Sequence, residues 1–414
     1  MIAFSRYSRY VIELKEVQEF IFSQCSKLST DEVEISKSRG LVLAGTVISN
    51  DDIPPFPNTA MDGYAVRALD TVNAPVELKV VGTLPAGKVP DFKVGPDEAV
   101  RIMTGAVIPE GADSVVMVEK TREAERDNFV VVEESVKDGN FIRQPGEDFV
   151  KGTELFASGT LIGAAHIGVF ATIGLEEVTV FKRPVVGVMS TGDELVQGAT
   201  RLEPGQIRDS NRHSVKALLD EIGVEVIDLG LIPDDEEKIE SALLSAVEKC
   251  DAIVTSGGVS MGDFDFVKVV LDRLGEMKWM QVAIKPAKPL AFGLLNGVPV
   301  FGLPGNPVSA MVSFELFMRP ALLKIMGYAQ IWRPYLKAKA VTSFKRRQDG
   351  KVHFARVALI RKKDSYEVSF LEGQGSHQLA AMANAQGLAV LPNGEGVEEG
   401  DFVDVMQLSE PEIN

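Results

Sequence analysis

Three stretches of this 414-residue chain decide its fold: STGDEL at 190–195, SGGVSMGDFD at 256–265 and LPGNPVS at 303–309. Each follows a short apolar run rich in Val, Ile and Leu, which is typical of a strand buried on both faces of a parallel sheet. Loops that follow parallel strands meet at the carboxyl edge of the sheet, where open α/β sheets bind ligands. The sequence therefore predicts that these three loops line one crevice.

The composition is that of a globular chain, with 45% hydrophobic and 25% charged residues. A formal net charge of −16 argues against nucleic acid and anionic membranes as general partners, because both need a positive field. The tail nevertheless carries a basic stretch: Lys345, Arg346, Arg347, Lys351, Arg356, Arg361, Lys362 and Lys363. We interpret it as a charged strand edge, with a contribution to an anion site as the alternative.

Cysteine usage and hydropathy indicate the compartment. Cys25 and Cys250 are the only cysteines and neither belongs to a CxxC pair, which argues against a structural disulfide or zinc site and favours a reducing cytoplasm. The chain starts without a secretory signal, and no run reaches the ~18 apolar residues of a membrane helix. The longest apolar run, LIGAAHIGVFATIG at 161–174, predicts a buried helix with a packed His166.

Hydrophobic spacing changes along the chain. The first fifty residues read mostly helical, with Val11, Leu14, Val17 and Phe20 near one face, and three prolines in DDIPPFPN end that pattern. Short strands follow over 74–150. Alternating strands and helices from Val185 predict a doubly wound α/β sheet. Alternation of period two returns after Pro334 and predicts a small terminal β-barrel.

Two motifs with known chemistry match only in part. GTLPAGKV at 82–89 fits GxxxxGK but ends in Val89 and sits between strands, so a nucleotide-binding loop is not favoured. GVSMG at 258–262 fits the GxSxG elbow of serine hydrolases. The preceding strand ends about five residues too early for an elbow, and His353 and His377 belong to the predicted β unit.

The same loops fit an anion and metal site better. Backbone N–H groups of Ser256, Gly257 and Gly258 can approach an anion closely. Carboxylates near the strand ends suit Mg²⁺ bridged to a phosphate: Asp193, Glu194, Asp209, Asp263 and Asp265. Asp209 or Asp265 could instead simply cap a helix. In IKPAKPLA, Lys285 and Lys288 stand three residues apart, each directly before a proline that stiffens the segment, and could bind an oxyanion.

Taken in order, the motifs resemble those of the MoeA family of molybdopterin molybdenumtransferases, which is related to the E domain of gephyrin. Beyond the three loops, the matching stretches are PPFPNTAMDGYAV (54–66), RIMTGAVIPEGADSVVMVE (101–119), PGEDF (145–149), RDSN (208–211), IKPAKPLAFG (284–293) and MANAQGLAVLP (382–392). They cover nearly the whole chain.

The resemblance implies a fold and an assembly. It implies a helical or linking domain from residues 1–53 and 150–182, an inserted β domain at 54–149, a molybdopterin adenylyltransferase-like α/β domain at 183–330 and a β-barrel at 331–414. It also implies a homodimer whose active cleft is shared by the α/β domain of one subunit and the inserted domain of the other. Contacts with an adenylyltransferase and with recipient molybdoenzymes follow from the same resemblance.

The implied reaction inserts molybdate into adenylylated molybdopterin and releases AMP, with Mg²⁺ as cofactor. The residues transferred as catalytic are Asp62, Thr104, Asp148 and Glu194, and those transferred as metal ligands are Glu194, Asp209 and Asp265. The residues transferred as substrate-binding are Ser256, Gly257, Gly258, Lys285, Lys288, Pro304, Gly305, Asn306, Pro307, Arg356 and Ser376.

Two departures and two alternative functions stay open. Asn58-Thr59 replaces the more usual serine-bearing form before AMDGY, and Asp263 competes with Asp265 as a metal ligand. The chain could be the adenylyltransferase of the preceding step, although its long flanking domains disfavour this. It could also be a molybdopterin carrier or scaffold. Molybdate and tungstate are tetrahedral dianions of similar size, so the sequence does not separate them.

Overall fold

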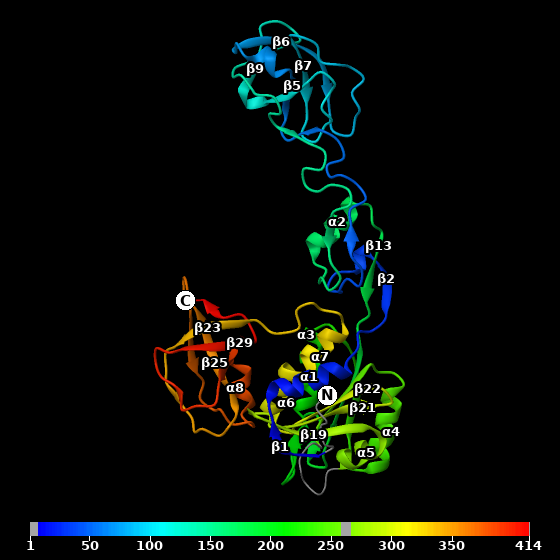
Figure 1. The fold of residues 1–414 in the computed structure, drawn as a ribbon, viewed down its shortest axis with the longest axis vertical. Coiled ribbons are helices and arrows are strands. Elements are labelled where there is room, and N and C mark those ends of the chain that lie inside the picture. The colour runs from blue at the N-terminus through cyan, green and yellow to red at the C-terminus, as the bar shows by residue number, and fades with distance from the viewer. Residues whose placement is uncertain (1–6, 258–265, 414) are drawn as a thin grey trace. The chain divides into compact units, whose positions relative to one another are not determined.

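The computed structural model describes residues 7–257 and 266–413. These form two compact units: residues 45–157 with 168–176 make up one, and the rest of the described chain makes up the other. Figure 1 shows the elements of both. No helix in the described ranges is long and apolar enough to cross a membrane.

The larger unit is built on a seven-stranded sheet. Its strands, in spatial order, are β1 (Tyr7–Ile12), β19 (Glu276–Val282), β21 (Pro289–Leu295), β22 (Val298–Leu303), β18 (Ala252–Ser256), β14 (Val185–Thr191) and β17 (Glu225–Ile232). All run in one direction except β21, which is antiparallel to both neighbours. Asn296 and Gly297, with φ of 50° and 84°, form the tight hairpin turn that reverses the chain between β21 and β22.

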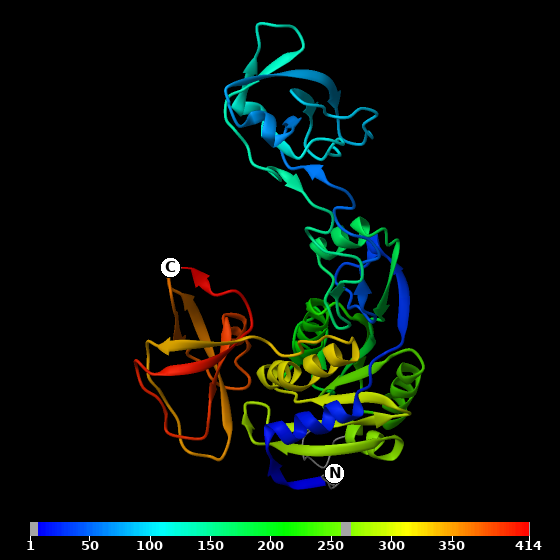
Figure 2. The ribbon, with the colours of Figure 1, turned by 45° about the horizontal axis from the view of Figure 1, so that its top comes forward.

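Helices cover both faces of this sheet, which confirms the predicted doubly wound α/β fold. One face carries α1 (Leu14–Gln24), α3 (Asn211–Glu221), α6 (Pro307–Ser313) and α7 (Arg319–Ile325). The other carries α4 (Glu236–Val247) and α5 (Phe266–Leu274). A π-helical stretch, Phe314–Met318, joins α6 to α7. In Figure 2, α1 lies across the sheet.

The start of the chain differs from its helical prediction. Helix α1 begins only at Leu14, because the preceding residues extend the sheet as edge strand β1, parallel to β19. Ile12, Val17 and Ile21 are buried in the same core as the sheet. After α1 the chain forms β2 (Thr30–Glu34), paired with β13 (Glu177–Phe181). The first strand and helix are therefore held by the α/β sheet.

The tail forms a closed β-barrel, as predicted. Its strands are β23 (Tyr335–Ala340), β25 (Val352–Arg361), β26 (Tyr366–Phe370), β27 (Gly387–Leu391) and β29 (Phe402–Gln407). Pairing runs β25, β26, β23, β29, β27 and back to β25, so no edge is left open in that ring. Short strand β20 (Ile284–Lys285) of the α/β unit pairs with the start of β25.

The smaller unit contains the predicted inserted β structure. Its six-stranded sheet has the order β8 (Ser114–Met117), β5 (Gly63–Val66), β7 (Glu98–Ile102), β6 (Val76–Leu84), β10 (Phe129–Val132) and β9 (Thr121–Glu123). A Cβ on Gly63 would lie 1.9 Å from the carbonyl oxygen of Val116, so only glycine lets β5 and β8 approach this closely.

The remaining elements are short. Among them are three pairs of strands: β3 (Val47–Ile48) with β12 (Glu154–Phe156), β4 (Asn58–Thr59) with β11 (Ile142–Arg143), and β24 (Phe344–Lys345) with β28 (Gly396–Val397). Helix α2 (Ala164–Thr172) forms where expected, but Phe170 is its only fully buried residue, so the prediction of a buried helix was wrong. Its His166 Nδ1 accepts a hydrogen bond from the Gly163 N–H.

A buried ion pair fixes the helix that follows the LPGNP loop to the chain leading into the barrel. Glu315, in the π-helical stretch, is 3% exposed. Both of its carboxylate oxygens accept hydrogen bonds from Arg333, at 2.8 and 2.9 Å. Arg333 also donates to the Leu408 carbonyl oxygen at 3.1 Å. This network holds the barrel against the α/β domain.

Replacing Glu315→Ala is expected to destabilise the chain by about 3–5 kcal/mol, because the largely buried Arg333 guanidinium loses its buried counter-ion and keeps only the exposed Glu221, 3.5 Å away. Urea unfolding followed by circular dichroism measures the change. The control is Asp404→Ala, which breaks the exposed Lys337–Asp404 pair and should cost no more than about 1 kcal/mol. Equal stability of the two variants would contradict this role for Glu315.

Candidate functional site

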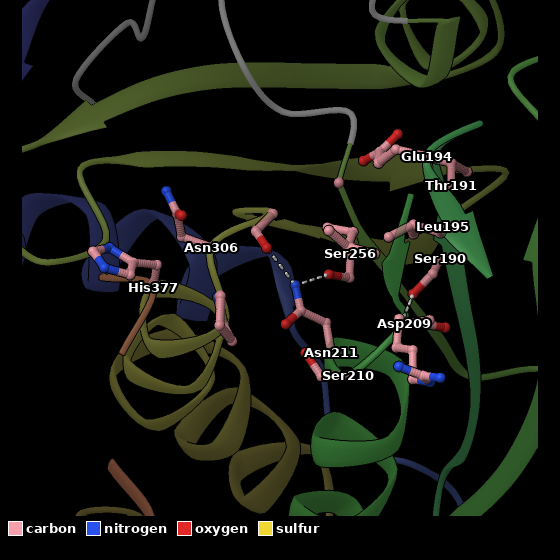
Figure 3. Close-up of a pocket in the computed structure, with 15 residues that line it drawn as sticks. Ser190, Thr191, Glu194, Leu195, Asp209, Ser210, Asn211, Ser256, Asn306 and His377 are labelled. Carbon is pink, nitrogen blue, oxygen red and sulfur yellow. Dashed lines mark hydrogen bonds between the residues drawn. The ribbon is translucent and has the colours of Figure 1, made fainter. Parts of the chain in front are cut away.

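The three loops named first in the sequence meet at one pocket of about 290 Å³ at the carboxyl ends of β14, β18 and β22. Figure 3 shows its side chains. The lining residues are Ser190, Thr191, Glu194, Leu195, Ile207, Arg208, Asp209, Ser210, Asn211, Ser256, Gly257, Gly305, Asn306, Pro307 and His377. The predicted crevice therefore exists, although residues 258–265, with Gly258, Asp263 and Asp265, lie outside the described residues.

Asn211, the first residue of α3, ties the loops together. Its side-chain amide donates to Ser256 Oγ and to the Gly305 carbonyl oxygen, each at 2.7 Å, as Figure 3 shows. Gly257 has a φ of 92°, and a Cβ there would lie 2.9 Å from the Thr191 carbonyl oxygen. Glycine at this position therefore lets the second loop close onto the first.

Asp209 is buried and already bonded. Its carboxylate accepts from Ser190 Oγ at 3.1 Å and from Arg212 Nε at 2.9 Å. Arg212, also buried, reaches Asp228 at 2.6 Å. Burial alone would raise the pKa of Asp228, but hydrogen bonds from Lys216 and Arg212 lower it to about 2. The structure therefore supports a structural ion pair for Asp209, and its metal role stays a prediction.

Glu194 lies exposed at the pocket, close over the backbone of its own loop. A Cβ on Gly192, whose φ is 145°, would lie 2.6 Å from Glu194 Oε2. Asp193 and Asp234 accept hydrogen bonds from each other's backbone N–H at 3.2 and 3.4 Å. Burial raises the pKa of Asp234, and the negative charges of Asp193 and Glu194 raise it further. This corner of the site carries excess negative charge.

Sequence reasoning missed Asp234. It lies just after β17, at the same edge of the sheet as the other strand-end carboxylates, and that position in the sequence could have identified it.

In the ranges 7–257 and 266–413, no group of three His, Cys, Asp or Glu side chains is arranged to hold a metal ion.

The LPGNP loop begins a helix as predicted. Pro307 is the first residue of α6, and Gly305, Asn306 and Pro307 line the pocket while Pro304 is not among its lining residues. The Val308 N–H donates to the Ser376 carbonyl oxygen at 3.0 Å. This bond brings a barrel loop to the site. His377 on that loop lines the pocket, and the sequence interpretation did not place it in the site.

Lys285 and Lys288 are not among the described residues that line the pocket. Lys285 is exposed on β20, where it pairs in register with His353 of the barrel, and Lys288 is half-buried. Arg356 is 1% exposed. Its Nη2 donates to the carbonyl oxygens of Gly373 and Gly375, whereas Nε and Nη1 have no partner among the described atoms. Burial lowers the pKa of Arg356.

The basic stretch of the tail does not form one patch. Arg346 is buried and donates to carbonyl oxygens of Leu391 and Pro392 and to Asp349, so it holds a turn of the barrel. Lys351 directly precedes β25 and Lys362 directly follows it, and these two ends of a ten-residue strand lie roughly 30 Å apart.

In the smaller unit the structure brings Asp62 and Thr104 together. The Thr104 N–H and hydroxyl both donate to Asp62 Oδ1, at 2.7 and 2.8 Å. These two hydrogen bonds hold the pKa of Asp62 below its ordinary value, so the exposed carboxylate stays ionised. Asp148 is also exposed, and its N–H donates to the Ile53 carbonyl oxygen at 2.9 Å. The GTLPAGKV segment connects two strands of this sheet, as expected.

Three family models match the chain in order. They are the MoeA N-terminal region (domain I and II) over 12–174, a probable molybdopterin binding domain over 187–324 and the MoeA C-terminal region (domain IV) over 339–408. The pocket and most of its lining residues fall in the second of these.

Curated relatives and solved structures match over nearly the full length. The chain is 39% identical to a molybdopterin molybdenumtransferase of Haemophilus influenzae, over 91% of this chain and 93% of that protein. It is 37% identical to one of Nostoc, over 95% and 93%. A crystal structure of a molybdopterin biosynthesis moeA protein from Pyrococcus horikoshii is 28% identical and superposes with a TM-score of 0.82, covering 96% of this chain and all of that one. This chain belongs to the MoeA family of molybdopterin molybdenumtransferases.

Proposed function

We propose that this chain inserts molybdate into adenylylated molybdopterin and releases AMP. The observation that carries the proposal is the pocket where three strand-end loops meet, inside the part matched by the molybdopterin-binding model. Relatives named molybdopterin molybdenumtransferase, similar over more than 90% of the chain, support the same activity.

The pocket is suited to the molybdopterin part of the substrate. Its volume of about 290 Å³ is at the lower end for small-molecule sites. Ser256 and Asn306 present polar side chains, and Gly257 and Gly305 leave the backbone accessible. We propose that these side chains and backbone groups hold the phosphate and the polar edge of the pterin.

For the oxyanion we propose Lys285, Lys288, Arg356 and Ser376. Arg356 supports this assignment, because a buried guanidinium with two unpaired nitrogens, Nε and Nη1, is costly and a bound dianion would offset that cost. Lys285 lies on the strand that pairs with the strand of Arg356. Molybdate and tungstate would meet the same donors, so these donors do not distinguish the two oxyanions.

For Mg²⁺ the donor set fits in part. Asp209 is committed to Arg212, whereas Glu194 is exposed at the pocket beside the Asp193–Asp234 pair. Mg²⁺ commonly binds one or two carboxylates together with substrate phosphates and water. We therefore propose Glu194 as the ligand from the described residues, with Asp265 as its predicted companion. The bound ion would neutralise charge on the pyrophosphate link.

The chain's own residues would supply position and charge. Asp62, held ionised by Thr104, would orient a water molecule or the oxyanion, and Asp148 would lie with them. We propose that these three residues come from the inserted domain of a second subunit, so that a homodimer holds two shared sites.

The proposal is tested by incubating the full chain with adenylylated molybdopterin, Mg²⁺ and molybdate. AMP and metal-loaded cofactor should form together and depend on molybdate. AMP transfer from ATP to molybdopterin would instead favour an adenylyltransferase, and tight pterin binding without AMP release would favour a carrier.

Mixed dimers test the shared site in the same assay. Asp62→Ala and Glu194→Ala should each be inactive alone. Co-expressed, they form mixed dimers with one site carrying both changes and one site carrying neither, so about a quarter of the wild-type activity returns. Asp62→Ala mixed with Asp148→Ala is the control and should stay inactive, because both residues lie in the inserted domain and each site of the mixed dimer then carries one of the two changes. Failure of the first mixture to recover activity would contradict a shared site.

The contact between Asp62 and Thr104 predicts a pH effect. Activity that needs ionised Asp62 falls as the pH drops through its lowered pKa. Thr104→Val removes the hydroxyl donor and raises that pKa, so the acid limb of kcat/KM moves to higher pH. Thr104→Ser keeps a hydroxyl and should hold the limb near the wild-type position. An unmoved limb in Thr104→Val would show that Asp62 is not the group that titrates.

A further inference from the structure

His377 comes to the pocket from the barrel on a loop that the structure holds firmly. The Gly375 N–H donates to Gln378 Oε1 at 2.6 Å, and buried Arg356 binds the carbonyl oxygens of Gly373 and Gly375. A Cβ on Gly375 would lie 2.9 Å from the His377 ring. Glycine there therefore lets the imidazole fold back over its own loop.

The loop is also fixed to the α/β domain. The Ser376 carbonyl oxygen accepts the Val308 N–H at 3.0 Å, and Gln374 donates to the carbonyl oxygens of Arg356 and Leu371. Since Ser376 is bonded directly to the first turn of α6, the next residue is placed beside Asn306. Figure 3 shows the His377 ring and the Asn306 amide next to each other on one side of the pocket.

The His377 nitrogens have no hydrogen-bond partner in the part of the chain that the structure describes, and the Asn306 side chain makes no capping bond there either. Other polar groups of the pocket are committed. Arg208 donates to the carbonyl oxygens of Gly198 and Thr200, both at 2.9 Å. Arg212 neutralises Asp209. An anionic group that enters this side of the pocket therefore meets the imidazole as an available donor.

We propose that His377 binds the phosphate of molybdopterin, so that the barrel of the same subunit completes the substrate pocket. This inference rests on the proposed function, because it takes molybdopterin as the occupant. An imidazole N–H donates to a phosphate oxygen, and the neighbouring Asn306 amide donates beside it. Loss of a hydrogen bond to a charged group of this kind weakens binding by roughly tenfold to a hundredfold.

Anaerobic titration calorimetry on the full chain tests this without turnover, with molybdopterin and AMP as separate probes. His377→Ala should weaken molybdopterin binding about tenfold or more and leave AMP binding unchanged. His377→Gln, which keeps an N–H donor, should recover part of the affinity. The control is His213→Ala, which removes an exposed histidine of α3 that does not line the pocket.

Wild-type affinity of His377→Ala for molybdopterin would overturn the inference, and so would a selective loss of AMP binding. The two proposals fail separately. If the wild-type chain binds molybdopterin but inserts no molybdate, the proposed reaction is wrong, while the affinity ratio of the two proteins still decides the role of His377.

Discussion

The pocket depends on one buried amide. Asn211 stands at the start of α3 and donates to both Ser256 and Gly305, so it bridges the ends of two neighbouring strands, β18 and β22. The remaining loop, STGDEL, joins them through the close approach of Gly257 to Thr191. The end of β14 is held by the hydrogen bond from Ser190 to Asp209, which is itself paired with Arg212. Parallel strands bring their ends to one edge, but side-chain bonds decide that the loops there form a single site.

The barrel extends this arrangement. It pairs with the α/β domain through β20 and β25, is held by the Glu315–Arg333 ion pair, and reaches the pocket through Ser376 and His377. A strand pair, a buried ion pair and a backbone hydrogen bond thus join the barrel to the α/β domain. Substrate binding and barrel position should therefore be linked in this chain.

Much of the fold follows from the sequence because apolar period and strand-end glycines are local signals. The doubly wound sheet, the barrel, and the meeting of STGDEL with LPGNP were predicted from them. The N-terminal strand was not, because six residues before a helix carry too little pattern to show that they extend a distant sheet. Strand β21 was not predicted, because the sequence analysis of that segment considered only its lysines. The Asn-Gly turn that follows the strand was a usable signal for a hairpin.

The sequence predicted which loops form the site, but not which side chains bond to one another within it. Asp209 was predicted as a metal ligand, and the sequence does not show that Arg212, one turn later, reaches its carboxylate. His377 and Asp234 were missed because each reaches the site through tertiary packing. The most direct measurement of the central claim is the affinity of Asn211→Ala for molybdopterin. With two hydrogen bonds lost at about 1 kcal/mol each, binding should weaken roughly tenfold or more while the far-UV spectrum is kept; unchanged affinity would contradict a pocket organised by this residue.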